Sequence, residues 1–321
     1  MSMQVLSPGL LTTVQDAGRF GYRGAGVGVS GALDGYSRAV ANLLVGNPAD
    51  AAVLEITLHG PRLLFRRTAR LALCGAGVDA RVGSLELPGW RPVDLPADSE
   101  LQLGNCRNGC RTYLAVAGGF RVPEVLGSRS TDLRGGFGGS NGRALRAGDV
   151  LPLSPDSVQE QTLAAKIAPW WIDPAPDLEF NGTTTLRVLP GHDLLAQDDT
   201  LTMSTFRVAA ASNRQGLRLE GPSLRVTKTS ERISEPVAPG TLQLPPDGQP
   251  IVLLADAQTV GGYPRIGHVI SADLPRLAQL RPGDYLRFER IEPEHARLLA
   301  CQQRQRLARI GLAIENRSRQ R

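Results

Sequence analysis

The sequence has few of the residues on which several classes of protein depend. Aromatic residues make up only 5% of the 321 positions, lysine occurs only at Lys166 and Lys228, and no basic patch is interleaved with aromatic side chains. The chain therefore has too few aromatic side chains to bind nucleic acid by base stacking, and we expect no nucleic-acid partner. No run approaches the roughly 18 apolar residues of a membrane span, and residues 1–10 do not resemble a signal peptide. These absences predict a cytoplasmic protein without a membrane partner.

Cysteine and histidine are also scarce. The pair Cys106 and Cys110 has neither a second pair nor a nearby histidine to complete a tetrahedral zinc site, so we expect no metal. Buried or idle thiols in a reducing cytoplasm are the main interpretation of the four cysteines, and a disulfide between Cys106 and Cys110 is the alternative. The sequence contains no nucleophile elbow, no HExxH motif and neither of the common nucleotide-binding fingerprints.

Glycine and proline are abundant by contrast. They occupy 36 and 23 positions, about 18% of the chain, where about 12% is usual. This excess predicts many turns and a mainly β fold. Short apolar runs bounded by turn residues have the length of strands, and they lie at 52–58, 71–74, 112–117, 185–189, 251–255 and 285–288.

Three segments have a helical pattern. Residues 34–45 begin with Asp34, a candidate N-cap, and stop at Gly46, and residues 272–280 form a second short candidate. Residues 292–314 are amphipathic, with an arginine-rich outer face. Because residues 287–321 hold nine arginines and four glutamates, they account for the entire net charge of +5. We therefore assign the net positive charge of the chain to one C-terminal segment, which either docks onto another surface or is solvated.

A weak internal repeat indicates two related β domains. Residues 143–153 (RALRAGDVLPL) parallel 278–288 (AQLRPGDYLRF), and in each copy a Gly-Asp turn precedes a final strand. Such a turn has a structural cause, because glycine accepts a positive φ and aspartate hydrogen-bonds nearby backbone. The proline-rich stretch 154–176 divides the halves, with Trp170 and Trp171 as an apolar anchor. The predicted division is 1–153 for the first β domain, 154–180 for a linker or arm, 181–290 for the second β domain and 291–321 for the basic tail.

Polar clusters next to turns are the candidate sites. The glycine-dense stretch 134–143 has the composition of an anion-binding loop or of a plain mobile loop, and 128–131 groups three hydroxyls around an arginine, as an anion site or as a turn cap. Asn213, Arg214 and Arg218 suit a carboxylate or amide ligand or surface salt bridges. Residues 256–264 follow an apolar strand, where functional loops are common.

Several motifs occur together in order and resemble one family. They are Val5–Gly24, Ser30–Asp34 (SGALD), Tyr113–Val122, Val125–Gly139, Ser212–Pro222, Gly240–Pro250 and Ile251–Leu274. This series resembles the KipA, or allophanate hydrolase subunit 2, family, which also includes the C subunits of 5-oxoprolinases and matches the carboxyltransferase part of biotin-dependent urea carboxylase. The resemblance covers about residues 3–290.

The resemblance implies two tandem cyclophilin-like β-barrel domains with a few short helices, to which the C-terminal helix is added. It also implies two partners, an A subunit plus a KipI-like B subunit. Together they would couple ATP hydrolysis to the opening of a small cyclic amide, 5-oxo-L-proline, to L-glutamate. The chain itself would carry no covalently bound cofactor, and ATP would be used by the complex.

The family motifs also imply site residues. We expect Arg214 as a carboxylate or oxyanion partner, and Asp256 as an acid/base or as a group that orients one. Val260 and Gln215 depart from the more frequent threonine and methionine. The implied substrate-binding residues are Asn213, Gln243, Gln258, Thr259, Tyr263, Ser128, Arg129, Ser130 and Thr131, with Gly216, Gly261 and Gly262 as loop glycines.

Two other functions stay open at this point. The first is the carboxyltransferase component of a biotin-dependent urea or amide carboxylase. Biotin would then be on another chain, because neither Lys166 nor Lys228 lies in an Ala-Met-Lys-Met-like context. The second is a non-enzymatic regulator that antagonises a KipI-like kinase inhibitor.

Overall fold

The computed structural model describes residues 2–154, 162–174, 178, 182–197, 199–227 and 233–319, the side chains of 318 and 319 excepted. Two compact units are present. The first comprises Met1–Arg19, Asp34–Pro176 and Gln305–Arg321, and the second comprises Phe20–Leu33 and Asp177–Arg304. The units are thus interleaved in sequence, whereas we expected a contiguous division. Residues 155–161, 175–177 and 179–180 of the expected linker lie outside the described part of the chain.

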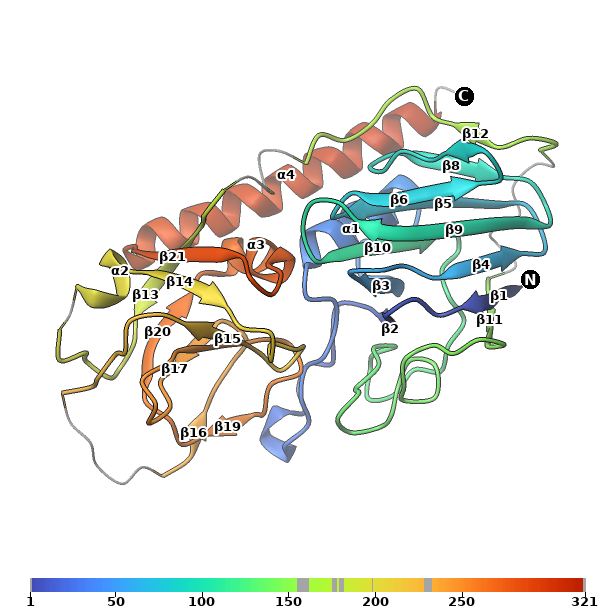
Figure 1. The fold of residues 1–321 in the computed structure, drawn as a ribbon. Helices are drawn as coiled ribbons and strands as arrows, with labels where there is room; N and C mark the ends of the chain where they lie inside the picture. The colour runs from blue at the N-terminus through green and yellow to red at the C-terminus, as the bar shows by residue number, and fades with distance from the viewer. Residues whose placement is uncertain are drawn as a thin grey trace. The chain divides into compact units, whose positions relative to one another are not determined.

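The first unit consists of two six-stranded sheets, in the orders β11-β1-β4-β9-β6-β7 and β12-β8-β5-β10-β3-β2 (Figure 1). Its mainly β character is confirmed, and its ladders form two sheets. The strands are β1 (Ser2–Ser7), β2 (Leu11–Gln15), β3 (Val53–Thr57), β4 (Arg62–Phe65), β5 (Ala69–Gly75), β6 (Val78–Val82), β7 (Leu85–Glu86), β8 (Pro92–Leu95), β9 (Ser99–Cys106), β10 (Arg111–Val116), β11 (Val150–Pro152) and β12 (Lys166–Ile167).

Strand patterns explain how the first unit forms its core. In β9, apolar side chains are buried and alternate with partly exposed ones, as expected for a strand with one wet face. Every residue of β10 is buried, because α1 (Gly35–Leu44) covers the other face of its sheet. The Asp34 carboxylate accepts a hydrogen bond of 2.8 Å from the Ser37 N–H, which confirms the predicted N-cap.

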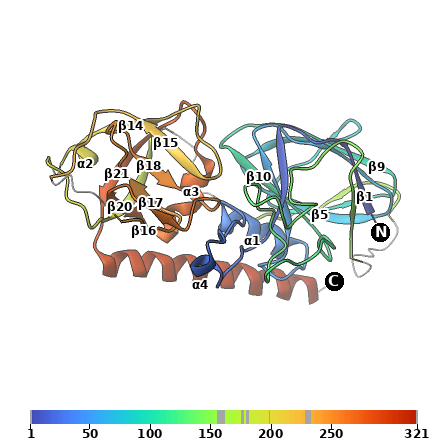
Figure 2. The same cartoon turned by 90° about the horizontal axis from the view of Figure 1, so that it is seen from below.

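The second unit contains a closed barrel with the strand order β13-β20-β17-β18-β15-β14-β21 (Figure 2). The barrel confirms the predicted fold class for this half. Its strands are β13 (Thr184–Pro190), β14 (Thr205–Val208), β15 (Gly216–Glu220), β17 (Thr241–Gln243), β18 (Ile251–Leu253), β20 (Arg265–Val269) and β21 (Tyr285–Arg290). A separate ribbon pairs β16 (Glu235–Pro236) with β19 (Val260–Gly261), and the short helices are η1 (Arg23–Ala25), α2 (Thr200–Met203), η3 (Ser271–Asp273) and α3 (Leu274–Gln279).

Both predicted Gly-Asp turns are present. Gly148 and Gly283 have φ angles of 91° and 94°, which favour glycine. The carboxylates of Asp149 and Asp284 each accept a 2.8 Å hydrogen bond from a backbone N–H three residues earlier. Each turn leads into a strand, β11 in the first unit and β21 in the second.

The C-terminal segment is one helix, α4 (Pro293–Arg319), as predicted. Its first part contributes Ala296 and Leu299 to a small apolar cluster of the second unit. Its second part belongs to the first unit, where the Arg317 guanidinium lies 5.3 Å from the ring centre of Trp170. Across the described residues, none of the helices combines the length and apolar character that crossing a bilayer requires.

Candidate functional site

The loop that follows β18 organises the polar residues of the second unit. The backbone N–H of Asp256 donates to the Arg214 carbonyl at 3.1 Å, and the N–H of Leu254 donates to the Gln215 carbonyl at 2.9 Å. At the far end of the loop, the Thr259 carbonyl accepts a 3.0 Å hydrogen bond from the Val237 N–H. Residues 254–259 are therefore fixed by main-chain bonds from several elements, which is the support that a precise site needs.

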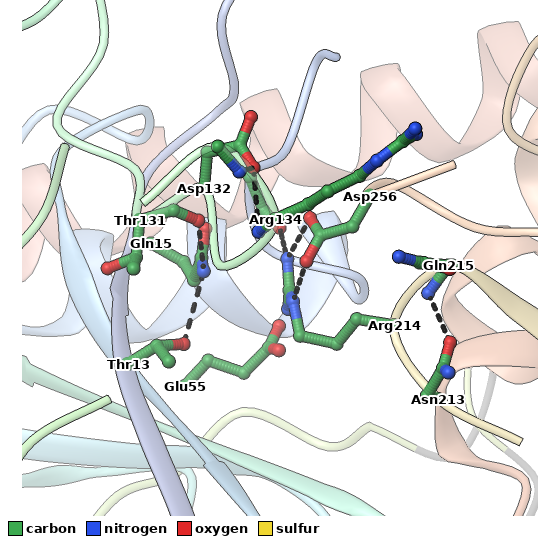
Figure 3. A network of polar contacts seen from close by, with 12 residues as sticks. Thr13, Gln15, Glu55, Thr131, Asp132, Arg134, Asn213, Arg214, Gln215 and Asp256 are labelled. Atoms are coloured by element: carbon green, nitrogen blue, oxygen red, sulfur yellow. Dashed lines mark hydrogen bonds and ion pairs between the residues drawn. The ribbon is translucent and has the colours of Figure 1, made fainter. Parts of the chain in front are cut away.

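Arg214 and Asp256 form a buried, two-pronged ion pair (Figure 3). The Arg214 Nε and Nη2 atoms donate to the two Asp256 carboxylate oxygens at 2.8 and 3.0 Å, and both side chains are 4% exposed. This fork geometry is the strongest form of carboxylate recognition. Because each Asp256 oxygen already accepts a hydrogen bond, the geometry suits the orienting role for Asp256 better than the acid/base role.

The ion pair also holds a turn from the N-terminal part of the chain. Arg214 Nη2 donates to the Gly31 carbonyl at 2.7 Å, and the Ser30 N–H donates to the Ala255 carbonyl at 3.1 Å. Ser30 has a φ of 52°, a conformation that a serine adopts at a cost. Its hydroxyl oxygen is buried without a hydrogen-bond partner among the described residues. A strained residue with an unsatisfied polar group is typical of a ligand contact.

Gln243, the last residue of β17, contacts Gln258 of the loop that follows β18. The Gln243 side chain is 1% exposed, and its Oε1 atom accepts a 3.4 Å hydrogen bond from Gln258 Nε2. The Gln243 Nε2 atom is buried and has no hydrogen-bond partner in the described part of the chain. Burying an amide N–H without an acceptor is costly, so this group is prepared for a ligand oxygen.

At two of the predicted loop glycines, an added Cβ atom would lie too close to a neighbouring side chain. A Cβ atom at Gly261 would lie 2.4 Å from Gln243 Nε2, and one at Gly216 would lie 2.9 Å from Ile251 Cγ2. Gly261 thus makes room for the Gln243 amide. Gly262 has a more open environment, with Ser234 Oγ 3.7 Å from the position of its missing Cβ.

The other predicted residues of the second unit lie at its turns. The Asn213 side chain accepts a 2.8 Å hydrogen bond from the Gln215 N–H and closes a local turn (Figure 3). Thr259 is buried, whereas Tyr263 is 47% exposed. The loop after β18 carries Asp256 and Gln258. The structure brings Arg214 into contact with Asp256, and Gln243 into contact with Gln258 and Gly261.

The predicted hydroxyl cluster of the first unit surrounds an internal carboxylate. Ser128 Oγ and Ser130 Oγ donate to Asp16 Oδ1 at 2.7 and 2.5 Å, and the Arg129 N–H donates to Asp16 Oδ2 at 2.5 Å. Burial raises the pKa of Asp16, but the hydrogen bonds from Ser130, from the Arg129 and Gly18 N–H groups and from Ser128 outweigh it, so the pKa lies below its ordinary value. The anion that these serines bind in this structure is thus Asp16.

The remaining groups of this cluster are also engaged. The Thr131 hydroxyl donates to the Val14 carbonyl at 3.0 Å, and the Thr131 carbonyl accepts from Gln15 Nε2 at 3.2 Å (Figure 3). The Arg129 guanidinium is exposed and lies 3.3 Å from Glu124. The cluster therefore fastens residues 128–131 to the chain around β2, as the turn-cap alternative required.

The glycine-dense loop of the first unit is closely packed against the same segment. The N–H groups of Arg134 and Gly135 donate to Asp132 Oδ1 at 3.0 and 2.7 Å, so this loop also binds an internal carboxylate. A Cβ atom at Gly138 would lie 2.2 Å from the Ser130 carbonyl oxygen, and one at Gly139 would lie 1.9 Å from Thr131 Oγ1. Packing explains these glycines, whereas composition alone allows either an anion site or a mobile loop.

Thiols and metal ligands add no further centre to the described part of the chain. The described residues include all four cysteines and no disulfide joins them, so the alternative of a disulfide between Cys106 and Cys110 is wrong. Cys106 Sγ instead lies 3.6 Å from the Thr112 hydroxyl. Among the described residues, no group of three or more histidine, cysteine, aspartate or glutamate side chains is arranged to hold a metal ion.

Sequence reasoning missed Ser30, Gly31 and Asp16 as parts of these clusters. The SGALD and VQDAG motifs that contain them contributed only to the family resemblance. The Ser30–Gly31 dipeptide was a possible turn signal. Its partners, Ala255 and Arg214, lie far away in sequence, so local patterns could not assign it to a site.

Comparison with known proteins places these features in a family. The family model for the carboxyltransferase domain, subdomains A and B, matches residues 25–290. The chain is 42% identical over 312 residues to the 5-oxoprolinase C subunit of Escherichia coli (strain K12), covering 95% of this chain and 96% of that protein. It is 34% identical to the 5-oxoprolinase C subunit of Haemophilus influenzae, covering 88% and 89%. The crystal structure of the K. lactis urea amidolyase superposes with a TM-score of 0.88 at 32% identity, covering 96% of this chain and 20% of that one.

Proposed function

The chain belongs to the family of carboxyltransferase domains with subdomains A and B, and from this premise we propose that it is the C subunit of an ATP-dependent 5-oxoprolinase. The observation that carries the proposal is the similarity to two proteins of that name, which extends over about nine-tenths of both chains. In the proposed complex, the chain acts with an A subunit plus a KipI-like B subunit. The described cysteines form no disulfide, which suits the reducing cytoplasm that we propose as its compartment.

The proposed reaction opens the lactam ring of 5-oxo-L-proline. The bond between the ring carbonyl carbon and nitrogen breaks, the carbon gains an oxygen from water, and the nitrogen gains the protons that make an ammonium group. The product is L-glutamate, and ATP is hydrolysed to ADP and phosphate. Negative charge develops on the carbonyl oxygen during this step, so fixed donors near that oxygen lower the barrier.

Gln243 is the donor that we assign to the substrate carbonyl. Its Nε2 group is buried and unpaired within the described residues, and Gln258 holds its Oε1 atom, so the amide is oriented before the substrate arrives. Removing such a donor typically lowers kcat by roughly 100-fold to 1000-fold. Gly261 belongs to the same cluster as Gln243 and Gln258, because the Cβ atom of a larger residue there would occupy the space of the Gln243 amide.

Arg214 and Asp256 act as positioning residues in this proposal. Their pair fixes Gly31 and, next to it, the strained Ser30, whose hydroxyl we assign to a substrate contact. Asn213 closes the turn that carries Arg214, and Thr259 and Tyr263 belong to the segment that follows Gln258. Ser128–Thr131 contribute to the first unit through Asp16 and do not act as direct ligands in this proposal.

Reconstitution with the A and B subunits tests the proposal. We expect ATP-dependent glutamate release from 5-oxo-L-proline, and we expect Gln243→Ala to lower kcat while the complex still assembles. Gln249→Ala is the matched control, because the side chain of Gln249 lies at the surface and bonds the backbone of Gly221. Equal losses in the two variants would remove Gln243 from the site without affecting the overall function.

The second candidate is the carboxyltransferase component of a biotin-dependent carboxylase, which the similarity to the K. lactis urea amidolyase favours. Biotin would be carried by another chain, because Lys166 and Lys228 lack the sequence context of a biotinylated lysine. Turnover of urea that requires an added biotin carrier and carboxylase, with none of 5-oxo-L-proline, would support this candidate. Complex formation with the KipI-like B subunit, without turnover of either substrate, would instead indicate a regulator.

A further inference from the structure

A cavity of about 830 Å³ opens in the first unit, and its lining residues come mainly from β6, β9 and the loop between β7 and β8. Figure 1 labels β6, β8 and β9. Its volume lies within the range of about 300–1,000 Å³ that is typical of small-molecule sites. The predicted site residues do not line it, and the proposed ring opening makes no use of it.

The base of the cavity is apolar. Leu73, Leu87, Leu103 and Trp90 are all at least nine-tenths buried and line it. Trp90 has a φ of 60°, which is a true outlier for so bulky a residue. Two hydrogen bonds hold it there, from its N–H to the Leu73 carbonyl at 2.7 Å and from the Ile172 N–H to its carbonyl at 2.9 Å. Such strain is retained at sites that position a side chain for a ligand.

Irregular strands shape the wall of the same cavity. The pairing of β6 with β9 shifts register between Val78 and Ala80, and the pairing of β1 with β4 shifts between Val5 and Ser7. Ser7 and Asp79, which lie at these two irregularities, both line the cavity. Because β-bulges re-aim side chains and are common beside binding sites, the two shifts are consistent with a built pocket.

The rim carries three arginines, each anchored through its Nε atom. Arg62 donates to Glu100 at 2.8 Å, Arg81 donates to Gln102 at 3.0 Å, and Arg107 donates to Asp79. A guanidinium has five N–H donors, so each arginine keeps further donors for a ligand in an orientation that its protein partner fixes. With Glu100, the partner of Arg62, the acids Asp79 and Glu86 match the three arginines in number, so the rim offers oriented guanidinium donors without a net positive charge.

From an apolar base below an arginine rim we propose that this cavity binds a small organic anion with a planar apolar body. The body packs on Leu87, Leu103 and Trp90, and the carboxylate or phosphate group receives hydrogen bonds from Arg81 and Arg107. The site is distinct from the glutamine cluster of the second unit, so its occupation is independent of the ring-opening chemistry.

Calorimetric titration of the full chain with three probes tests the proposal. Indole-3-acetate carries an aryl body with a carboxylate, AMP carries an aryl body with a phosphate, and inorganic phosphate carries no body. We expect saturable binding of at least one organic anion and at least tenfold weaker binding of inorganic phosphate. Which organic anion binds more tightly distinguishes a carboxylate from a phosphate head group.

Substitutions at the rim locate the binding. Arg81→Gln and Arg107→Gln should each weaken the better probe by roughly tenfold, the usual effect of removing a charge-assisted hydrogen bond. Arg66→Gln is the matched control, because Arg66 pairs with Asp98 on the surface outside the cavity and should bind the probe like the parent. All three side chains are exposed, so the variants should unfold at the parent temperature.

Three results would overturn the proposal. These are a failure of both organic anions to saturate the chain, equal affinity for inorganic phosphate, and equal effects of the rim and control substitutions. Glutamate release by the complex is measured on the same variants. Because Arg81 and Arg107 lie outside the ring-opening site, complexes with these variants should release glutamate at the parent rate. Failure of the anion site and failure of the proposed function therefore give different results.

Discussion

Removal of one partner of the buried Arg214–Asp256 pair should destabilise the second unit strongly. In Arg214→Ala, the Asp256 carboxylate loses both of its charged donors, and the Gly31 carbonyl loses a 2.7 Å hydrogen bond. Both side chains are 4% exposed, so water does not replace the lost contacts. Breaking a buried pair in this way costs about 3–5 kcal/mol of unfolding free energy.

The double variant Arg214→Ala/Asp256→Ala separates the pair from the general effect of truncation. It removes both charges, so its loss should be clearly smaller than the sum of the two single losses. The exposed pair of Arg66 and Asp98, 3.4 Å apart, is the control, and Arg66→Ala should cost no more than about 1 kcal/mol.

Chemical unfolding followed by circular dichroism measures these differences. The three tryptophans all lie in the first unit, so tryptophan fluorescence reports that unit separately. We expect Arg214→Ala to shift the circular dichroism transition more than the fluorescence transition. A loss no larger than that of Arg66→Ala, or strictly additive single losses, would refute the view that this pair fixes the site.

Three further predictions concern the clusters around this pair. Gly261→Ala should cost about 1–3 kcal/mol by overpacking and lower kcat, and adding Gln243→Ala should restore thermal stability but not activity. Ser30→Ala should leave the unfolding temperature unchanged and lower kcat/KM roughly tenfold, the value of one lost hydrogen bond, whereas equal activity would exclude the hydroxyl as a ligand. Because the pKa of Asp16 is lower in the folded state, its stabilisation is complete above the ordinary pKa of about 4 and is lost as the pH falls through that value and below. Ser130→Ala should reduce this acid dependence in unfolding experiments between pH 2 and pH 6, and an unchanged slope would contradict the assignment.

Features with local causes were predictable from the sequence. The N-cap at Asp34 and the turns at Gly148 and Gly283 need only a few neighbouring residues, and the structure shows all three. The closed barrel followed from the family resemblance, since turn frequency and strand length indicated only a mainly β fold. The segments that make up each unit were harder to predict from the sequence, because Phe20–Leu33 joins the second unit through contacts with residues about 200 positions away.

The site was predictable as a set of residues but not as a set of roles. Arg214 and Asp256 were both expected, yet their mutual pairing depends on the main chain that brings two distant loops together. Ser128 and Ser130 had the composition of an anion site, and their anion is Asp16, more than 100 residues earlier. Composition gives the chemistry of a group, whereas the fold decides whether its partner is a ligand or another part of the chain.

The most direct test of the central claim is glutamate release from 5-oxo-L-proline by the purified A and B subunits, with and without this chain. We predict ATP-dependent release when all three are present, no release when this chain is omitted, and a large drop in kcat when Gln243→Ala replaces the parent. Release at the full rate by the other two subunits alone would contradict the claim that this chain is a working part of a 5-oxoprolinase.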